Sequence, residues 1–215
     1  MIGVWDYTVV LTYLSACTSF FGMAFAINNH FNTAIVCLAI SGLLDMFDGK
    51  VARKKKDRSE EAKKFGIQID SLCDVICFGV FPIVICYCIG IGKGKDIVGL
   101  IFLFFYGIAG IVRLAYFNVK EEMRQKETND NRKYYQGLPI TSISVVLPIV
   151  YVLSPFFPRE VFFVILRFIM LAVGVLFITD FKFKKPSNAQ IAILVLIVVF
   201  ALMIMFTSQW LKWKR

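Results

Sequence analysis

Four aspartates near the ends of two apolar segments are the residues of this chain best suited to chemistry. Asp45 and Asp48 are three positions apart, and Asp70 and Asp74 are four positions apart. If both segments are helical, each spacing places its two carboxylates on one helix face. Two facing pairs would form an oxygen-rich site that attracts divalent cations such as Mg²⁺ or Mn²⁺. The pattern therefore predicts a metal site, and its arrangement suits a two-metal clamp on phosphate oxygens.

The composition indicates that most of the chain lies in a membrane. It has 215 residues, of which 58% are hydrophobic, and its mean hydropathy of +0.71 is too high for an ordinary soluble domain. We expect an all-α integral membrane protein, a single domain over residues 1–215 built as a bundle of about six to seven transmembrane helices. The last helix would be an addition to a six-helix core. The expected helices are residues 8–27, 31–50, 66–90, 97–117, 138–153, 161–179 and 189–210.

Basic residues are distributed unevenly between the expected loops. The segments 50–64, 120–133 and 182–185 are rich in lysine and arginine, whereas the loops on the opposite side carry few basic residues. The positive-inside rule therefore places the rich loops, the four aspartates and a polar cavity at the cytoplasmic side of the cell membrane. Attraction to anionic lipid headgroups accounts for the net charge of +9, so we expect no nucleic-acid partner. The first apolar segment is long enough to span a membrane and lacks a basic flank, so we expect no cleaved signal peptide.

Two segments that contain the aspartates match a longer pattern. Residues 44–53 and 66–74 resemble the D-x-x-D-G-x-x-A-R … G-x-x-x-D-x-x-x-D motif of the CDP-alcohol phosphatidyltransferase family. Members of that family move a phosphatidyl group from a CDP-activated lipid to a small alcohol. Residues 70–82, 113–118 and 134–139 resemble the membrane-embedded phosphatidylserine synthases within the family. The spacer between the two halves of the motif is about one helical turn longer than in the family pattern, which can lengthen a helix end without rotating the acids apart.

The resemblance implies a role for each residue of the motif. Asp45, Asp48 and Asp70 would be ligands of two divalent cations, Mg²⁺ or Mn²⁺. The last acid, Asp74, would be both a ligand and the general base that activates the acceptor hydroxyl. The small residues Gly49, Ala52 and Gly66 would let the nucleotide approach the backbone, or they would merely allow close helix packing. Arg53 would contact the diphosphate. The predicted contacts to the CDP-lipid are Gly49, Ala52, Arg53 and Gly66.

The same resemblance implies that the acceptor is serine. Its carboxylate needs a fork of hydrogen-bond donors, and its ammonium group needs acceptors. Arg113 lies near the cytoplasmic end of an expected span, where its guanidinium could bind the carboxylate. The alternative is that its side chain snorkels to the membrane interface. The predicted serine-binding residues are Arg113, Asn118, Arg132 and Gln136.

Three functions stay open on the sequence alone. The first is transfer of a phosphatidyl or archaetidyl group from CDP-diacylglycerol or CDP-archaeol to L-serine, with release of CMP. The second is the same chemistry with another acceptor, such as glycerol phosphate, inositol or inositol phosphate. The third is a transporter that uses the aspartates as a proton or metal relay, which would leave the D-G-x-x-A-R spacing unexplained. The resemblance favours the first function and implies a homodimer, whereas a single histidine, His30, is inconsistent with a two-histidine phosphotransfer mechanism.

Overall fold

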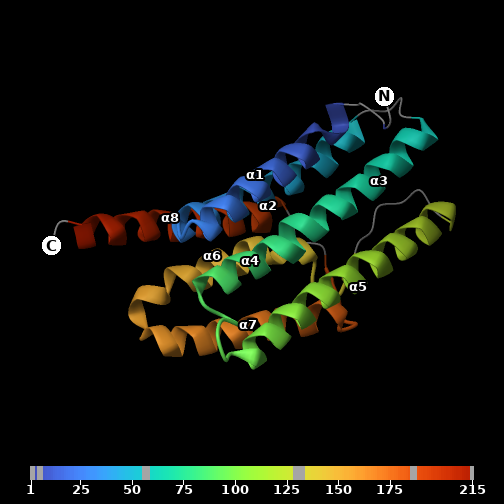
Figure 1. Cartoon of the computed structure of the whole chain (residues 1–215). Helices are drawn as coiled ribbons and strands as arrows, with labels where there is room; N and C mark the ends of the chain where they lie inside the picture. The colour runs from blue at the N-terminus through green and yellow to red at the C-terminus, as the bar shows by residue number, and fades with distance from the viewer. Residues whose placement is uncertain (1–2, 4–6, 55–58, 128–133, 185–187, 214–215) are drawn as a thin grey trace.

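A computed structural model describes residues 3, 7–54, 59–127, 134–184 and 188–213 of the chain. Long helices lie side by side in this part of the chain, and α8 ends at the opposite end of the bundle from the start of α1 (Figure 1). The helices are α1 (Val10–Ile27), α2 (Phe31–Lys54), α3 (Glu60–Asp74), α4 (Phe81–Ile89), α5 (Ile97–Glu127), α6 (Ile143–Val152), α7 (Arg159–Ile178) and α8 (Asn188–Trp213). The shorter elements are η1 (Tyr7–Val9), η2 (Val75–Val80), β1 (Tyr134–Gln136), η3 (Ile140–Ser142), η4 (Ser154–Phe156) and β2 (Lys182–Lys184).

The expected helical membrane architecture is confirmed. Within the described residues, five helical segments are long and apolar enough to cross a membrane, and two shorter apolar helices cover Ile140–Phe156 and Ala189–Met205. Each of the segments expected from hydropathy is therefore helical. The sequence did not predict the two short strands β1 and β2, which pair antiparallel with Gln136 opposite Lys182. This small ribbon joins the connection after α5 to the connection after α7.

One continuous helix carries two of the aspartates into the bundle. Directly after Asp74, α3 passes into the π-helical segment η2 and then into α4. Pro82 in α4 has no N–H with which to bond the carbonyl of Phe78, four residues earlier. The buried hydroxyl of Tyr106 on α5 donates a hydrogen bond to that carbonyl instead. Because a buried carbonyl needs a partner, α5 stabilises the irregular turn that follows Asp74.

The helices α1 and α2 pack closely through small polar side chains. The hydroxyl of Ser41 on α2 lies 2.7 Å from the hydroxyl of Ser15 and 2.9 Å from that of Ser19, both on α1. All three side chains are buried. In hydrocarbon, such interhelical hydrogen bonds satisfy polar groups that water cannot reach, and small residues let the backbones approach. The pair forms a fixed frame for the aspartates near the end of α2.

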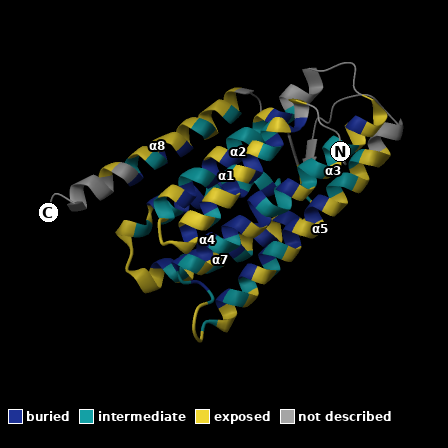
Figure 2. Ribbon diagram, turned by 45° about the horizontal axis from the view of Figure 1, so that its top comes forward, coloured by how far each residue is buried: buried dark blue, intermediate teal, exposed yellow. Residues whose placement is uncertain are grey.

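Buried residues line the centre of the bundle, and exposed residues gather on its outer faces (Figure 2). The outer faces are apolar: on α5, for example, Ile101, Phe104 and Ile108 are exposed at helical spacing. The centre is equally apolar, with Leu38 and Phe78 fully buried. A bundle that is apolar both inside and outside suits a surrounding of lipid rather than water.

Candidate active site

The predicted aspartates lie on two helices that the fold brings together at one end of the bundle. Asp45 and Asp48 are on α2, and Asp70 and Asp74 are on α3. One carboxylate oxygen from each of Asp45, Asp70 and Asp74 lies within 4.8 Å of the other two. Asp48 is outside this group of three, but its side chain is in hydrogen-bonding contact with Asp70. The structure thus brings three carboxylates to one point and places the fourth beside them.

The donor set fits a divalent metal ion. A second contact of hydrogen-bonding range joins Asp45 to Asp74, and Asp48 is only 6% exposed. Carboxylates in contact repel one another unless a proton or a cation lies between them, and the repulsion is stronger away from water. Hard oxygen ligands at this spacing are those that Mg²⁺ and Mn²⁺ prefer. The side chains of Asp45, Asp70 and Asp74 can therefore hold a metal ion between α2 and α3, with Asp48 beside them.

Two interhelical contacts hold the segments that carry the aspartates. Thr12 on α1 donates a hydrogen bond of 2.8 Å from Oγ1 to Oδ2 of Asp48. On the other side, the hydroxyl of Ser71 lies 2.8 Å from Nδ2 and 3.0 Å from Oδ1 of Asn118 on α5. Ser71 is the residue after Asp70. Partners of this kind orient metal-binding side chains and fix the helix that presents them.

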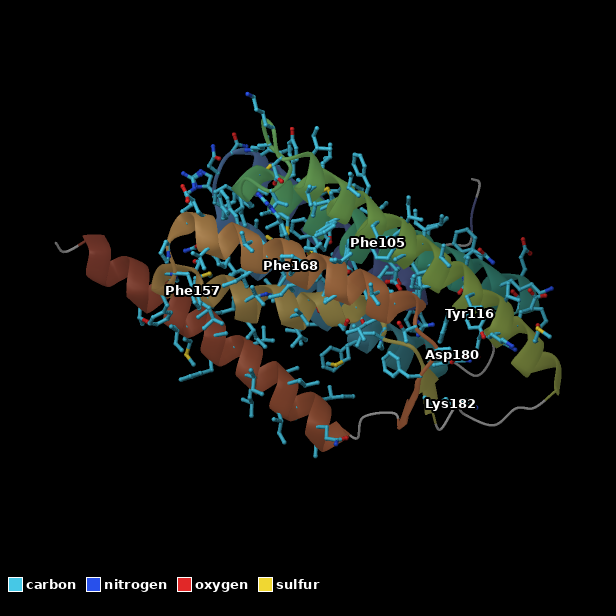
Figure 3. All side chains as sticks on the ribbon, turned by 90° about the horizontal axis from the view of Figure 1, so that it is seen from below. Phe105, Tyr116, Phe157, Phe168, Asp180 and Lys182 are labelled. Atoms are coloured by element: carbon cyan, nitrogen blue, oxygen red, sulfur yellow. The ribbon has the colours of Figure 1, made fainter. Side chains whose placement is uncertain are left out.

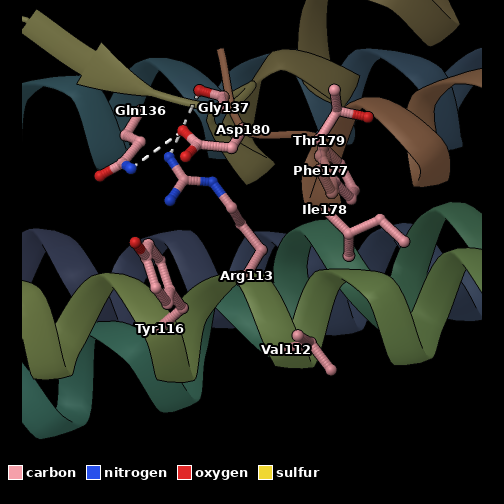
Figure 4. A pocket seen from close by; sticks show the side chains of 9 residues that line it. All are labelled: Val112, Arg113, Tyr116, Gln136, Gly137, Phe177, Ile178, Thr179 and Asp180. Carbon is pink, nitrogen blue, oxygen red and sulfur yellow. Dashed lines mark hydrogen bonds between the residues drawn. The ribbon is translucent and has the colours of Figure 1, made fainter. Parts of the chain in front are cut away.

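A pocket of about 310 Å³ opens beside α5. Its lining includes Arg113 and Tyr116 from α5, Gln136 from β1, and Asp180 from the connection between α7 and β2 (Figure 4). Tyr116, Asp180 and Lys182 lie toward the same end of the molecule, away from Phe157 (Figure 3). Two of the predicted serine-binding residues, Arg113 and Gln136, therefore share one cavity.

The other two predicted serine-binding residues are not in this pocket. Asn118 does not line it, and its amide is bonded to Ser71 on α3. Arg132 lies outside the described residues. Arg113 and Asn118 are five residues apart on α5, about 7.5 Å along the helix axis, and so project from different faces of that helix.

Arg113 is buried in the protein rather than extended to the membrane interface. It is 6% exposed, and its Nε donates a hydrogen bond of 3.0 Å to the carbonyl of Leu138. Its Nη2 lies 3.5 Å from the carbonyl of Gly137, and its guanidinium carbon lies 5.4 Å from the centre of the Phe117 ring. This burial disfavours the snorkelling alternative. The guanidinium holds the turn that leads into η3 and also faces the pocket (Figure 4).

The turn at Gly137 shapes the wall of the pocket. Gly137 has a φ of 70°, and a Cβ at this position would lie 3.1 Å from the carbonyl oxygen of Thr179. The conformation and the close approach both favour glycine. The amide of Gly137 donates a 2.8 Å hydrogen bond to the carbonyl of Phe181, which brings Gln136 beside Asp180. Nε2 of Gln136 then donates a hydrogen bond of 2.9 Å to Oδ1 of Asp180.

Comparison with known proteins decides the family. A model of the CDP-alcohol phosphatidyltransferase family matches residues 7–157, which include all four aspartates and Arg113. The chain belongs to the CDP-alcohol phosphatidyltransferase family. The match extends well beyond the aspartate motif and covers more than half of the chain.

Two similar proteins align with most of this CDP-alcohol phosphatidyltransferase, and a third aligns with half of it. It is 34% identical to the CDP-diacylglycerol–serine O-phosphatidyltransferase of Helicobacter pylori over 195 residues, which are 85% of this chain and 76% of the relative. It is 29% identical to the archaetidylserine synthase of Methanothermobacter thermautotrophicus over 181 residues, 83% of this chain and 70% of the relative. The CDP-diacylglycerol–serine O-phosphatidyltransferase of Saccharomyces cerevisiae is 36% identical over 109 residues, 50% of this chain and 37% of the relative.

The remaining residues of the family motif lie beside the aspartates in the sequence and on the same two helices. Gly49 follows Asp48 in α2, and Gly66 precedes Asp70 by about one turn of α3. Both glycines are half-buried. Ala52 and Arg53 belong to the last turn of α2, but their side chains lie outside the described part of the chain.

The long spacer of this family member contributes to α3. The helix begins at Glu60, and Ser59 caps it by accepting a hydrogen bond of 3.1 Å from the amide of Ala62. The helix therefore starts more than a turn before Gly66. Residues 60–65 of the spacer are thus helical, and the aspartates of α2 and α3 are brought together.

Sequence reasoning missed three residues that contact or face the candidate site, namely Thr12, Ser71 and Asp180. The first two are small polar residues inside apolar helices, and their partners are distant in sequence. Nothing in the local pattern indicates which way they point. Asp180 did leave a signal, because it is a single acid between an apolar span and a basic segment. Its place beside Gln136 depends on the pairing of β1 and β2.

Proposed function

We propose that this protein transfers the phosphatidyl or archaetidyl group of a CDP-activated lipid to the hydroxyl of L-serine and releases CMP. The grouping of carboxylates from α2 and α3 carries the proposal, because it supplies ligands for metal-assisted transfer from a diphosphate. Serine as the acceptor is supported by the names of the similar proteins from Helicobacter pylori and Methanothermobacter thermautotrophicus. The lipid donor is CDP-diacylglycerol or CDP-archaeol.

In the proposed site, the four aspartates hold two divalent cations, Mg²⁺ or Mn²⁺. Bound cations of this kind neutralise charge on the diphosphate and on the departing phosphate of CMP. Asp74 is positioned as the general base and takes the proton of the serine hydroxyl. The hydroxyl oxygen forms a bond to the phosphorus on the lipid side while the bond from that phosphorus to the CMP oxygen breaks. The bonding electron pair leaves with CMP.

The donor and the acceptor use different residues. We assign the CDP-lipid to Gly49, Arg53 and Gly66, with Ala52 giving the nucleotide room to approach α2. We assign the serine carboxylate to Arg113, with Gln136 in the same pocket and Arg132 as a further basic residue nearby in the sequence. The contact of Asn118 with Ser71 favours a role in holding α3 against α5 over direct serine binding.

We further propose that the aspartate end of the bundle faces the cytoplasm. In the sequence, the basic segments 50–64, 120–133 and 182–185 follow Asp48 of α2, Asn118 of α5 and the pocket residue Asp180. A charged nucleotide donor and a polar amino acid then arrive from the cytosol while the lipid tails stay in the membrane.

We also propose that the chain is a single domain with α8 added to a six-helix core, and that it assembles as a homodimer.

Release of CMP from a CDP-lipid tests the proposed function. The purified protein in detergent or proteoliposomes is given CDP-diacylglycerol or CDP-archaeol with Mg²⁺ or Mn²⁺, and candidate alcohols are added one at a time. We expect L-serine to accelerate release, and glycerol phosphate, inositol and inositol phosphate to have little effect. Chelation of the metal should stop the reaction, and readdition should restore it.

Two results would contradict this proposal in different ways. Acceleration by another alcohol and not by serine would keep the chemistry and replace the acceptor. If no alcohol released CMP from either lipid in the presence of metal, the transferase assignment itself would be wrong and a transport role for the aspartates would have to be tested.

A further inference from the structure

The pocket beside Arg113 carries a charge that the proposed acceptor site does not yet use. Asp180 lines the same cavity as Arg113, and the two residues come from different parts of the fold (Figure 4). Arg113 is on α5, and Asp180 lies between the end of α7 and the start of β2. A cation and an anion therefore face one cavity from two separate elements.

Asp180 is located by one hydrogen bond of its own and by contacts of its two neighbours. Nε2 of Gln136 donates a hydrogen bond of 2.9 Å to its Oδ1. The residues on either side of it are also held: the amide of Thr179 bonds the carbonyl of Val175, and the carbonyl of Phe181 accepts from Gly137. Because these contacts tie it to α7 and to the Gly137 turn, the carboxylate has a defined place at the rim of the pocket.

Opposite charges that line one small cavity are complementary to a zwitterion. The cavity of about 310 Å³ is at the small end of the range for ligand sites, which suits an amino acid. A phosphorylated alcohol would bring its negative charge close to Asp180, which disfavours it, and a neutral polyol would satisfy neither charge. We propose that Asp180, oriented by Gln136, receives the ammonium group of the acceptor while Arg113 receives its carboxylate.

This inference rests on the proposed function and adds the reason for its selectivity. In this arrangement Asp180 is a specificity-determining residue, and Gln136 is a positioning residue that acts through it. The acceptor class is then a zwitterionic amino alcohol. An alcohol that carries only a carboxylate would gain the contact to Arg113 but lose the one to Asp180.

The variant Asp180→Asn isolates the charge of this side chain. Asparagine keeps an oxygen that can accept the hydrogen bond from Gln136, so the local structure is preserved while the negative charge is removed. We expect the KM for L-serine to rise about tenfold to a hundredfold, because a charge-assisted contact to the ammonium group is lost. The KM for the CDP-lipid should be unchanged.

Glycerate provides a readout that a purely structural defect would not reproduce. It has the carboxylate and hydroxyl of serine but carries a second hydroxyl in place of the ammonium group. As a competitor of serine-dependent CMP release, it should bind the variant as well as the wild type or better. The ratio of the serine KM to the glycerate inhibition constant should therefore rise at least tenfold in Asp180→Asn. Glu61→Gln, which removes an exposed charge from the start of α3, is the matched control and should leave this ratio unchanged.

The outcomes test the role of Asp180 and the proposed transfer to serine separately. If wild-type protein shows no serine-dependent CMP release, the proposed function fails. If release depends on serine but Asp180→Asn leaves the serine KM unchanged, Asp180 does not contact the ammonium group. An equal weakening of serine and glycerate would likewise overturn the inference, because it would show a general distortion of the pocket.

Discussion

Thr12 Oγ1 donates a hydrogen bond of 2.8 Å to Asp48 Oδ2. Both residues are buried, with exposed fractions of 5% and 6%, so water does not compete for this contact. The bond links α1 to α2 at the level of the aspartates. Because a carboxylate held by one oxygen presents the other in a defined direction, Thr12 orients a residue that we propose as a metal ligand.

The first prediction concerns this bond. Thr12→Val keeps the shape of the side chain and removes the donor, so Asp48 loses its orientation and a buried acceptor loses its partner. We expect metal affinity to fall about tenfold to a hundredfold. Binding of Mn²⁺ to the purified protein, followed by electron paramagnetic resonance, measures this directly, and the metal dependence of CMP release gives a second reading.

Thr12→Ser is the control, because it retains the hydroxyl at the same position. It should bind Mn²⁺ nearly as well as the wild type. Equal Mn²⁺ affinity in the valine variant and the wild type would show that Asp48 does not need this bond.

The second prediction concerns the carboxylates of α3. Asp70→Asn and Asp74→Asn keep the size of the side chain but remove a charge from the proposed metal site, and Asp74→Asn also removes the proposed base. We expect both variants to lose CMP release. In Asp74→Asn, the loss of the base alone should lower it about 10²–10⁴-fold. The variants should elute from size-exclusion chromatography like the wild type, since their main proposed interaction is with metal and substrate. Near-normal turnover by either variant would rule out the two-metal assignment.

The aspartate cluster could be predicted because its information is local. The spacing of Asp45 and Asp48, and that of Asp70 and Asp74, fixes which helix face each pair occupies. Hydropathy likewise locates the long spans, because an apolar run of sufficient length has few alternatives to a membrane helix. The aspartate pairs and the long spans can therefore be predicted without knowing how the helices pack.

The contacts between helices could not be predicted because they depend on how the helices rotate and pack. Arg167 lies in the apolar helix α7, and nothing near it in sequence indicates that its partner is Asp96, at 2.9 Å. The same holds for Asn118, which the sequence suggested as a serine contact and whose hydrogen bond to Ser71 on α3 it did not indicate. The strand pairing that places Gln136 beside Asp180 involves short segments, and their alternation of polar and apolar residues is too short to predict a strand.

The third prediction separates the donor site from the acceptor site. Arg113→Lys keeps the charge but cannot reproduce the planar fork that pairs with a carboxylate. We expect the KM for serine to rise about tenfold to a hundredfold while the affinity for the CDP-lipid stays nearly unchanged. Arg53→Lys should show the opposite selectivity, because Arg53 is assigned to the diphosphate. Steady-state kinetics with each substrate varied in turn gives both constants.

Two results would revise this assignment. If Arg113→Lys weakened the CDP-lipid and spared serine, Arg113 would belong to the donor site. If it changed neither constant, its role would be confined to the carbonyls of Gly137 and Leu138, which it bonds in this structure.

The fourth prediction concerns pH and the turn between α4 and α5. Asp96 Oδ2 and Oδ1 accept hydrogen bonds of 2.8 Å and 3.0 Å from the amides of Gly92 and Gly99, and Oδ2 lies 2.9 Å from Nη2 of Arg167. Desolvation by itself would raise the pKa of Asp96. The two amide bonds and the charge of Arg167 outweigh it, so the pKa of this carboxyl is lower in the folded protein than its ordinary value of 3.8.

The sign of the pH effect follows from this shift. A carboxyl whose pKa is lower in the folded state contributes stability above its unfolded pKa and loses that contribution as the pH falls through the folded value. At neutral pH, Asp96→Asn should therefore lower the Tm of the protein in detergent, because the pair with Arg167 is lost. The difference in Tm between wild type and variant should shrink as the pH is lowered below 3.8, where Asp96 itself becomes protonated.

Glu160→Gln is a suitable control for this last measurement, since it removes an exposed acid from the first turn of α7, the helix that carries Arg167. It should lower the Tm little at any pH, as expected for a surface charge without a fixed geometry. A Tm difference between wild type and Asp96→Asn that stayed constant from neutral to acid pH would mean that the charge of Asp96 does not stabilise the turn. The difference would then come from the hydrogen bonds to Gly92 and Gly99, because the single side-chain oxygen of asparagine replaces only one of the two acceptors.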